Sequence, residues 1–293
     1  MTDEKQPDPT EQSPPTDPQT GEDLSWRRPA VAMLLFDRPA PTYREVGEVL
    51  AEIFEGTYEV DPGRDDDPTS AVTIEDATVF ATPLDEPIAD GEASRYTNDL
   101  AVWNGGEAVV DTHRSQVVVA AMRLGPVGDD GEPGDPEYMD PRLEALRCEL
   151  AVAHVVAALT ALPGAIAVSI GGAATTLPAA AYRDFVAGNP IPVPALVGVR
   201  AGMQSESTSC AYTSGLGRFG RLDLERLDVA APPGAVYGQI CDLVAYTLGS
   251  GTLFQPGQAL EVGGPEQLLT SLETSPFTGL PALRLTPASA GDA

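Results

Sequence analysis

The chain has 293 residues and carries 44 acidic against 17 basic side chains, which leaves a formal net charge of -27 at pH 7. A chain of this length can form one large domain or two small ones with a sizeable buried core. Its negative field repels nucleic-acid phosphates and anionic lipid headgroups. We therefore expect neither nucleic acid nor a membrane as a partner, and the charge favours a protein with a basic surface.

The three cysteines, Cys148, Cys210 and Cys241, show no paired spacing such as Cys-x-x-Cys. This argues against a zinc knuckle and against a dithiol redox motif. The N-terminus lacks a basic region followed by an apolar run, and no apolar stretch is long enough to cross a bilayer. The sequence therefore predicts a cytoplasmic protein with free thiols.

Residues 1–25 combine many prolines with Asp, Glu, Thr and Gln and contain almost no apolar side chains. Such a segment cannot bury enough apolar surface to offset the entropy lost on ordering, so we predict a disordered tail. Trp26 is the first residue expected to pack. The remaining chain, residues 26–288, is predicted to form an α+β domain.

The first half of this domain opens on a continuous apolar run, Ala30–Phe36, which is too short for a helix and indicates a buried strand. Thr42 and Glu45 have the spacing of a capping box, and apolar residues then recur at helical spacing until Gly56. The pattern further predicts strands at Ala71–Ile74, Ala77–Ala81 and Ser115–Leu124 and a short helix at Ser94–Trp103.

Residues 125–140 form an acidic segment rich in glycine and proline, which is a candidate boundary between two lobes. Asp140 and Pro141 then begin a helix that is predicted to run to Leu162 and to be centrally buried in its second half. Beyond it we predict strands at Ala165–Ile170, Ala195–Arg200, Ser209–Thr213, Leu222–Leu227, Ala259–Val262 and Ala282–Leu285, and helices at Pro178–Val186 and Gly234–Leu248.

In this order of elements, helices are interspersed with paired strands rather than alternating strictly with single strands. The order favours an α+β fold with mixed or antiparallel sheets flanked by helices. Ala30–Phe54 and Ala165–Val186 share the sequence strand, turn and helix. The sequence therefore allows two related β-α-β lobes.

Gly215, Gly217 and Gly220 have the spacing of a dinucleotide-binding loop. Such a loop must follow a buried strand and begin a helix. Here a polar segment precedes Tyr212–Gly220, and the alternating pattern of Leu222–Leu227 after it is typical of a strand. We therefore interpret the glycines as turn residues with positive φ, with Leu216 and Phe219 packed beneath them.

The two histidines, His113 and His154, are the only candidates for imidazole chemistry. His154 lies in the most apolar part of the long helix and is interpreted as a neutral core residue. His113 and Arg114 precede the Ser115–Leu124 strand, a position that suits either a general acid or base or a surface turn. Neither histidine has an accompanying nucleophile or further ligand, so no catalytic, cofactor or metal residue is assigned.

Several motifs together resemble a bacterial family of unknown function (DUF4261-like). They are Ala32–Phe36, His113–Val119, Leu162–Ala165 before Gly171-Gly172-Ala173, Val197–Arg200, Tyr212–Leu216 and Phe219-Gly220. The phrase around Thr213, Gly215 and Phe219 is also similar to suppressor-of-fused-like proteins, some of which act as immunity proteins. Gly217 and Arg221-Leu222-Asp223 replace the proline-containing continuation of that phrase, and the family supplies no catalytic residues to transfer.

These observations favour a non-enzymatic protein-interaction domain of immunity-like or regulatory type. The alternative is a small-ligand-binding protein or an enzyme with a cleft near His113, Arg200 and the turn at residues 212–220. For either function the candidate surface is His113, Arg114, Arg200, Tyr212, Gly215, Phe219 and Gly220.

Overall fold

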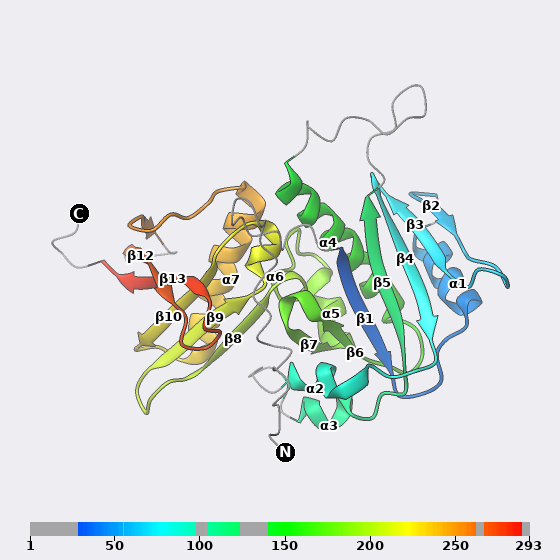
Figure 1. Ribbon diagram of the computed structural model, residues 1–293, viewed down its shortest axis with the longest axis horizontal. Helices are drawn as coiled ribbons and strands as arrows, with labels where there is room; N and C mark the ends of the chain where they lie inside the picture. Colours follow the sequence, from blue (N-terminus) through cyan, green and yellow to red (C-terminus); the bar gives the residue numbers. More distant parts are fainter. Residues whose placement is uncertain are drawn as a thin grey trace, which may run out of the picture.

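The computed structural model describes residues 29–54, 56–97, 103, 105–123, 140–261 and 267–288. Within these ranges the chain forms two sheets with flanking helices, so the predicted α+β class is confirmed (Figure 1). The predicted tail at residues 1–25 and most of the candidate boundary at residues 125–140 lie outside the described residues. None of the described helices is long and apolar enough to cross a membrane.

The first sheet has seven strands in the order β2-β3-β4-β5-β1-β6-β7, and every neighbouring pair is antiparallel. Strands β5 and β6, which lie on either side of residues 125–140 in the sequence, both pair with β1. The seven strands are β1 (Ala30–Phe36), β2 (Glu59–Asp61), β3 (Ser70–Ile74), β4 (Ala77–Leu84), β5 (Ser115–Arg123), β6 (Ala165–Ile170) and β7 (Thr175–Pro178).

Helices cover both faces of the first sheet. The helices α1 (Tyr43–Phe54) and α4 (Pro141–Leu159) pack on one face, where alternate residues of β1 such as Leu34 and Phe36 are fully buried. The short helices α2 (Glu92–Arg95) and α3 (Gly106–Val110) lie at the lower end of the sheet in Figure 1. Leu35 packs in a smaller cluster with residues of these helices, as strand alternation requires.

The second sheet has six strands in the order β11-β12-β13-β10-β9-β8, with β10 and β13 parallel and the other pairs antiparallel. Helix α7 (Pro233–Ser250) packs on one face of this sheet, against β8, β9 and β10. The strands are β8 (Gly198–Met203), β9 (Ser209–Ser214), β10 (Asp223–Val229), β11 (Ala259–Glu261), β12 (Gln267–Thr274) and β13 (Pro281–Pro287).

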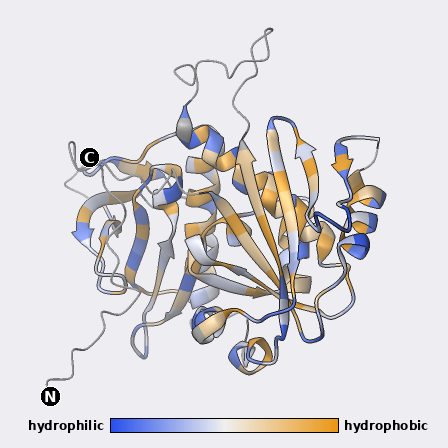
Figure 2. Cartoon of the chain, turned by 45° about the vertical axis from the view of Figure 1, so that its right-hand side comes forward, coloured by the Kyte–Doolittle hydropathy of each residue, from blue (hydrophilic) through white to orange (hydrophobic). Residues whose placement is uncertain are grey.

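Helices α5 (Ala179–Val186) and α6 (Val193–Leu196) connect the sheets, and α6 contacts both α4 and α7. One continuous core cluster includes buried residues from both sheets, among them Leu34 of β1 and Leu224 of β10. Figure 2 shows hydrophobic residues concentrated along the central strands of the first sheet. Along the chain, the first sheet ends with β7 and the second begins with β8. The division of the domain into two lobes near residues 125–140 stays a prediction.

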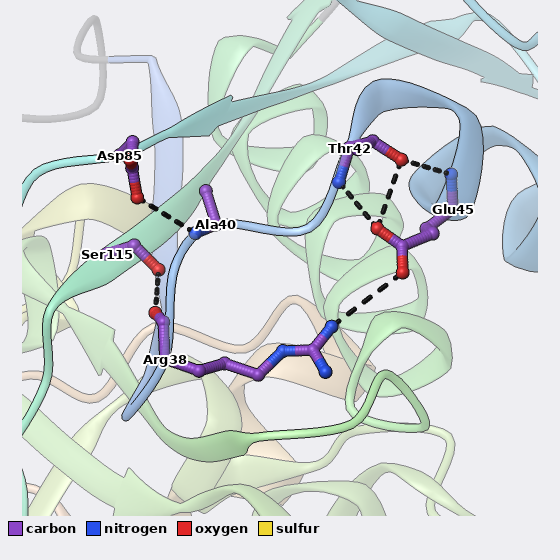
Figure 3. Close-up of polar contacts among 6 residues, drawn as sticks. All are labelled: Arg38, Ala40, Thr42, Glu45, Asp85 and Ser115. Carbon is purple, nitrogen blue, oxygen red and sulfur yellow. Dashed lines mark hydrogen bonds and ion pairs between the residues drawn. The ribbon is translucent and has the colours of Figure 1, made fainter.

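The predicted capping box of α1 is confirmed (Figure 3). The backbone N–H of Thr42 donates to Glu45 Oε2 at 2.7 Å, and the backbone N–H of Glu45 donates to Thr42 Oγ1 at 3.2 Å. Arg38 forms an ion pair with Glu45 at 3.7 Å, and its carbonyl accepts a hydrogen bond from Ser115 Oγ at 2.7 Å. The segment between β1 and α1 is thus fixed to both its own helix and the start of β5.

Three sequence predictions need correction. The helix expected at Ser94–Trp103 begins earlier and ends at Arg95, while residues 98–102 lie outside the described ranges. The strand expected at Ala195–Arg200 begins only at Gly198, and the residues before it end α6. Prolines at and just before the start of α6 favour this helical turn. His154 is exposed rather than buried, since it lies on the outer side of α4.

Candidate functional site

The Tyr212–Gly220 segment connects β9 to β10 through a single 3-10 turn, η6 (Leu216–Phe219). A strand follows this turn, so no α-helix N-terminus is available to hold a pyrophosphate. Gly215 and Gly220 have φ values of 98° and 62°, and Leu216 and Phe219 beneath them are fully buried. The interpretation of this segment as a turn between two strands is confirmed, apart from Gly217, for which no positive φ is found.

The half-buried aspartate Asp223 organises the turn through hydrogen bonds. Asp223 accepts hydrogen bonds from Thr213 Oγ1 at 2.7 Å and from the backbone N–H of Leu216 at 3.1 Å. Burial raises the pKa of the Asp223 carboxyl above its ordinary value, and these two hydrogen bonds oppose the change. Gly215 lies so close to the neighbouring backbone that an added Cβ would be 2.7 Å from the carbonyl oxygen of Gly172.

A buried ion pair joins the turn to α4. Arg218 Nη1 lies 2.5 Å from Glu149 Oε1, and the other terminal nitrogen of Arg218 donates to the carbonyl of Leu196 in α6. Burial raises the pKa of the Glu149 carboxyl, while the positive charge of Arg218 opposes this. This pair connects the turn, α4 and α6, so its role is structural.

Arg200 and Tyr212 form a second polar cluster, on neighbouring strands β8 and β9. Arg200 donates to Ser214 Oγ at 3.1 Å and to the carbonyl of Ala174, and its guanidinium lies 5.7 Å from the centre of the Tyr212 ring. The Tyr212 ring in turn stacks on Phe277 at 4.3 Å. The structure therefore brings together the predicted residues Arg200, Tyr212 and Gly215.

His113 and Arg114 lie elsewhere, in the connection between α3 and β5. His113 Nε2 accepts a hydrogen bond from the backbone N–H of Ile88 at 2.9 Å, and its Nδ1 lies 2.5 Å from the carbonyl oxygen of Val110. The backbone N–H of Arg114 donates to the carbonyl of Phe36 at 2.8 Å. These contacts match the reading of His113 as a residue that ties a surface turn.

Arg221 attaches the turn to the C-terminal half of α7. Its guanidinium donates to Thr247 Oγ1 at 3.0 Å, to the carbonyl of Thr247 at 2.8 Å and to the carbonyl of Phe219 at 2.7 Å. Burial lowers the pKa of Arg221 from its ordinary value. These hydrogen bonds hold the turn against α7.

Two cavities lie beside the turn and α7, and both are lined by Phe254. The smaller, of about 130 Å³, is lined by Leu216 and Gly220 of the turn and by Leu222 and Leu253. The larger, of about 490 Å³, lies between α7 and β11. We call the two together the Phe254 groove. Neither His113 nor Arg200 lines it.

The walls of the Phe254 groove combine exposed apolar side chains with carboxylates. Tyr246 is 57% exposed and stacks on Phe254 with 6.2 Å between ring centres, while Leu253 is 38% exposed. Asp242 borders the larger cavity from α7 and Glu261 from β11, and both are exposed. The larger cavity thus combines aromatic and aliphatic side chains with negative charge on two sides, whereas Arg221 lines the smaller cavity.

No sequence motif singled out the groove residues Asp242, Tyr246, Phe254 and Glu261. The available signal was Tyr246, a large aromatic residue placed off the apolar stripe of α7. A sequence pattern shows that such a residue faces away from the core but not what lies opposite it.

Within the described ranges, no three His, Cys, Asp or Glu side chains gather as metal ligands would. Burial raises the pKa of Cys210, and it raises the pKa of Cys241 to about 11, so both thiols are protonated at neutral pH. Comparison of the chain with protein families, curated proteins and solved structures finds no match. The family resemblance described above therefore rests on the sequence motifs alone.

Proposed function

We propose that this chain is a protein-interaction module that binds a basic partner through the Phe254 groove. The observation that carries the proposal is that exposed apolar side chains line two cavities that share Phe254: Leu222 and Leu253 line the smaller, and Tyr246 lines the larger beside two carboxylates. Exposed apolar side chains gathered in this way on a folded chain are typical of a binding site.

The composition of the groove matches the anatomy of protein interfaces. Aromatic anchors supply much of the binding free energy at such interfaces, and Tyr246 stacked on Phe254 provides one. Asp242 and Glu261 add negative charge to a molecule whose net charge is already -27. Long-range attraction therefore steers basic partners toward the groove, and the carboxylates orient them at close range.

The rest of the candidate surface supports this role indirectly. Gly220 and Leu216 line the smaller cavity, while Arg221 holds the turn against α7. Phe219 is fully buried and acts in packing. The motif resemblance implies that this interaction is of immunity-like or regulatory type.

The test compares the proteins that the wild-type chain and two variants capture from a lysate. Immobilised wild-type chain, Leu253→Asp and the matched control Ile53→Asp are exposed to the same lysate at low salt. Ile53 is a half-exposed apolar residue of α1, remote in sequence from the groove. We expect a protein that wild type and Ile53→Asp retain, that Leu253→Asp loses, and that rising salt releases. Identical capture by all three chains would contradict the proposal.

Binding of a small molecule in the larger cavity is the second candidate function. Its volume of about 490 Å³ lies within the range of ligand sites, about 300–1,000 Å³. This alternative predicts that a metabolite raises the unfolding temperature of the wild type but not of Tyr246→Ala. It also predicts no captured protein that depends on Leu253.

A further inference from the structure

A third cavity, of about 210 Å³, lies on the other side of the molecule's long helix, away from the Phe254 groove. It is formed by the end of α1, the turn between β3 and β4, and the outer side of α4. Its apolar lining is Phe54, Tyr58, Ile74, Ala77, Leu150 and Ala151. No part of the proposed function uses it.

The polar groups at this cavity are segregated by charge. Arg147 supplies the positive charge from α4, and His154, seven residues further along the same helix, also lines the cavity. Glu75 and Asp76 of the β3–β4 turn supply its acidic side. Arg147 Nη1 and Asp76 Oδ2 meet at 3.8 Å, and both side chains are about 40% exposed (43% and 39%). A partly exposed ion pair at this distance contributes little stability, so a ligand can replace it at small cost.

His154 is oriented by its own helix. Its Nδ1 lies 2.8 Å from the carbonyl oxygen of Leu150, a distance that a donating Nδ1–H satisfies. The other ring nitrogen, Nε2, then carries a lone pair and no hydrogen, so it can accept a hydrogen bond from a ligand N–H but cannot donate one to a carboxylate. Arg147 is therefore the anion-binding group that α4 supplies to the cavity.

We propose that this cavity binds a small zwitterion with an apolar side chain, of the class of the aromatic and branched α-amino acids. The ligand carboxylate pairs with Arg147, while its ammonium group pairs with Asp76 and Glu75. The apolar side chain occupies the space beside Phe54, Tyr58 and Leu150. Binding thus replaces the Arg147–Asp76 ion pair by ion pairs to the ligand and buries apolar surface.

Ligands with a single charge fit the cavity less well. An apolar carboxylic acid pairs with Arg147, but its carboxylate then lies near the carboxylates of Asp76 and Glu75 with no ammonium group to pair with them. An apolar amine satisfies the acidic side but separates Arg147 from its partner without replacing it. The segregated charges therefore distinguish a zwitterion from either analogue.

The experiment titrates the full-length chain with three probes that share one apolar body: L-phenylalanine, 2-phenylethylamine and 3-phenylpropionate. Binding is followed by saturation-transfer NMR and calorimetry. We expect saturable binding of L-phenylalanine and at least about tenfold weaker binding of both analogues. Arg147→Met and Asp76→Asn should each weaken L-phenylalanine binding by about tenfold or more.

Arg183→Met serves as the matched control, because Arg183 is an exposed arginine of α5 that does not line the cavity. It should bind L-phenylalanine like the wild type, and the unfolding temperature of each variant verifies that it folds. Equal binding of the three probes, full retention in Arg147→Met, or no binding of L-phenylalanine at about 10 mM would overturn the proposal. These results do not depend on the Phe254 groove, whose variants leave this cavity intact.

Discussion

At the residue scale, the buried ion pair between Glu149 and Arg218 connects three parts of the fold, which are α4, the 212–220 turn and α6. Both side chains are more than nine-tenths buried, and the pair joins α4 to the turn that borders the Phe254 groove. Taking two charges out of water is costly, and their mutual attraction and the Leu196 carbonyl offset that cost. Removal of one partner leaves the other buried without its counter-charge.

We therefore expect Glu149→Leu to lower the free energy of unfolding by about 3–5 kcal/mol, measured by urea titration. The double variant Glu149→Leu/Arg218→Met replaces both charges by apolar groups and should recover most of that loss. A single variant within about 1 kcal/mol of the wild type would show that this pair does not hold the turn to α4.

Cys241 yields a second residue-scale prediction, which concerns alkaline pH. Burial raises its pKa from 9.0 to about 11 in the folded chain, although a hydrogen bond with Tyr237 opposes the change. Between these values the folded chain keeps a proton that the unfolded chain has lost. Stability is therefore present below about pH 9 and falls as pH rises through this window, by up to about 1.4 kcal/mol per pH unit.

The measurement is the free energy of unfolding from pH 8 to pH 10.5 for the wild type and Cys241→Ala. The wild type should lose stability more steeply over this range, because the variant lacks the thiol. Parallel pH profiles would contradict the assignment of the effect to Cys241.

At the scale of single elements, α1 depends on its capping box. Thr42→Ala removes the side-chain acceptor for the backbone N–H of Glu45 and should cost about 1 kcal/mol of unfolding free energy. The hydrogen bonds from Thr42 also hold the pKa of the Glu45 carboxyl below its usual value of 4.5. That contribution is present above this value and is lost as pH falls through the lowered pKa.

Urea titrations of the wild type, Thr42→Ala and Glu45→Gln at pH 7 and at pH 3 measure both effects. The stability difference between the wild type and Glu45→Gln should shrink at the lower pH, where the carboxyl is protonated. A difference that is the same at both pH values would mean that the carboxylate does not cap α1.

Elements with a strong local signal were predictable from the sequence. The apolar run of β1 and the Asp140-Pro141 start of α4 are both confirmed at the predicted positions. Strand β12 was missed because polar residues occupy about half of Gln267–Thr274, so that the segment resembles a loop. Helix α6 was missed, and its last two residues were included in the strand predicted at Ala195–Arg200, because four residues are too few to show a helical period.

The candidate site was only partly predictable for a related reason. The glycines of the 212–220 turn signal their own backbone conformation, and they were assigned correctly at Gly215 and Gly220. The groove beside them is built from α7, the Leu253-Phe254 segment and β11, whose proximity is a property of the tertiary fold. His154 was misassigned because its apolar neighbours in sequence point to other sides of the helix.

At the scale of the whole molecule, one core links two sheets, and the Phe254 groove and the cavity beside Arg147 lie on different surfaces of it. The groove lies between α7 and the far strands of the second sheet, whereas the cavity lies between α1 and α4 beside the first sheet. The strong negative charge of the chain favours cationic groups at both. We propose that a basic protein occupies the groove.

Site-specific photo-crosslinking tests that claim most directly. The photoreactive residue p-benzoylphenylalanine replaces Tyr246 in one chain and Ile53 in a control chain, and each is irradiated in native lysate at low and high salt. We expect one discrete adduct with a basic protein, formed from position 246 at low salt, absent at high salt, and absent from position 53. The same adducts from both positions, or no adduct from position 246 at low salt, would contradict it.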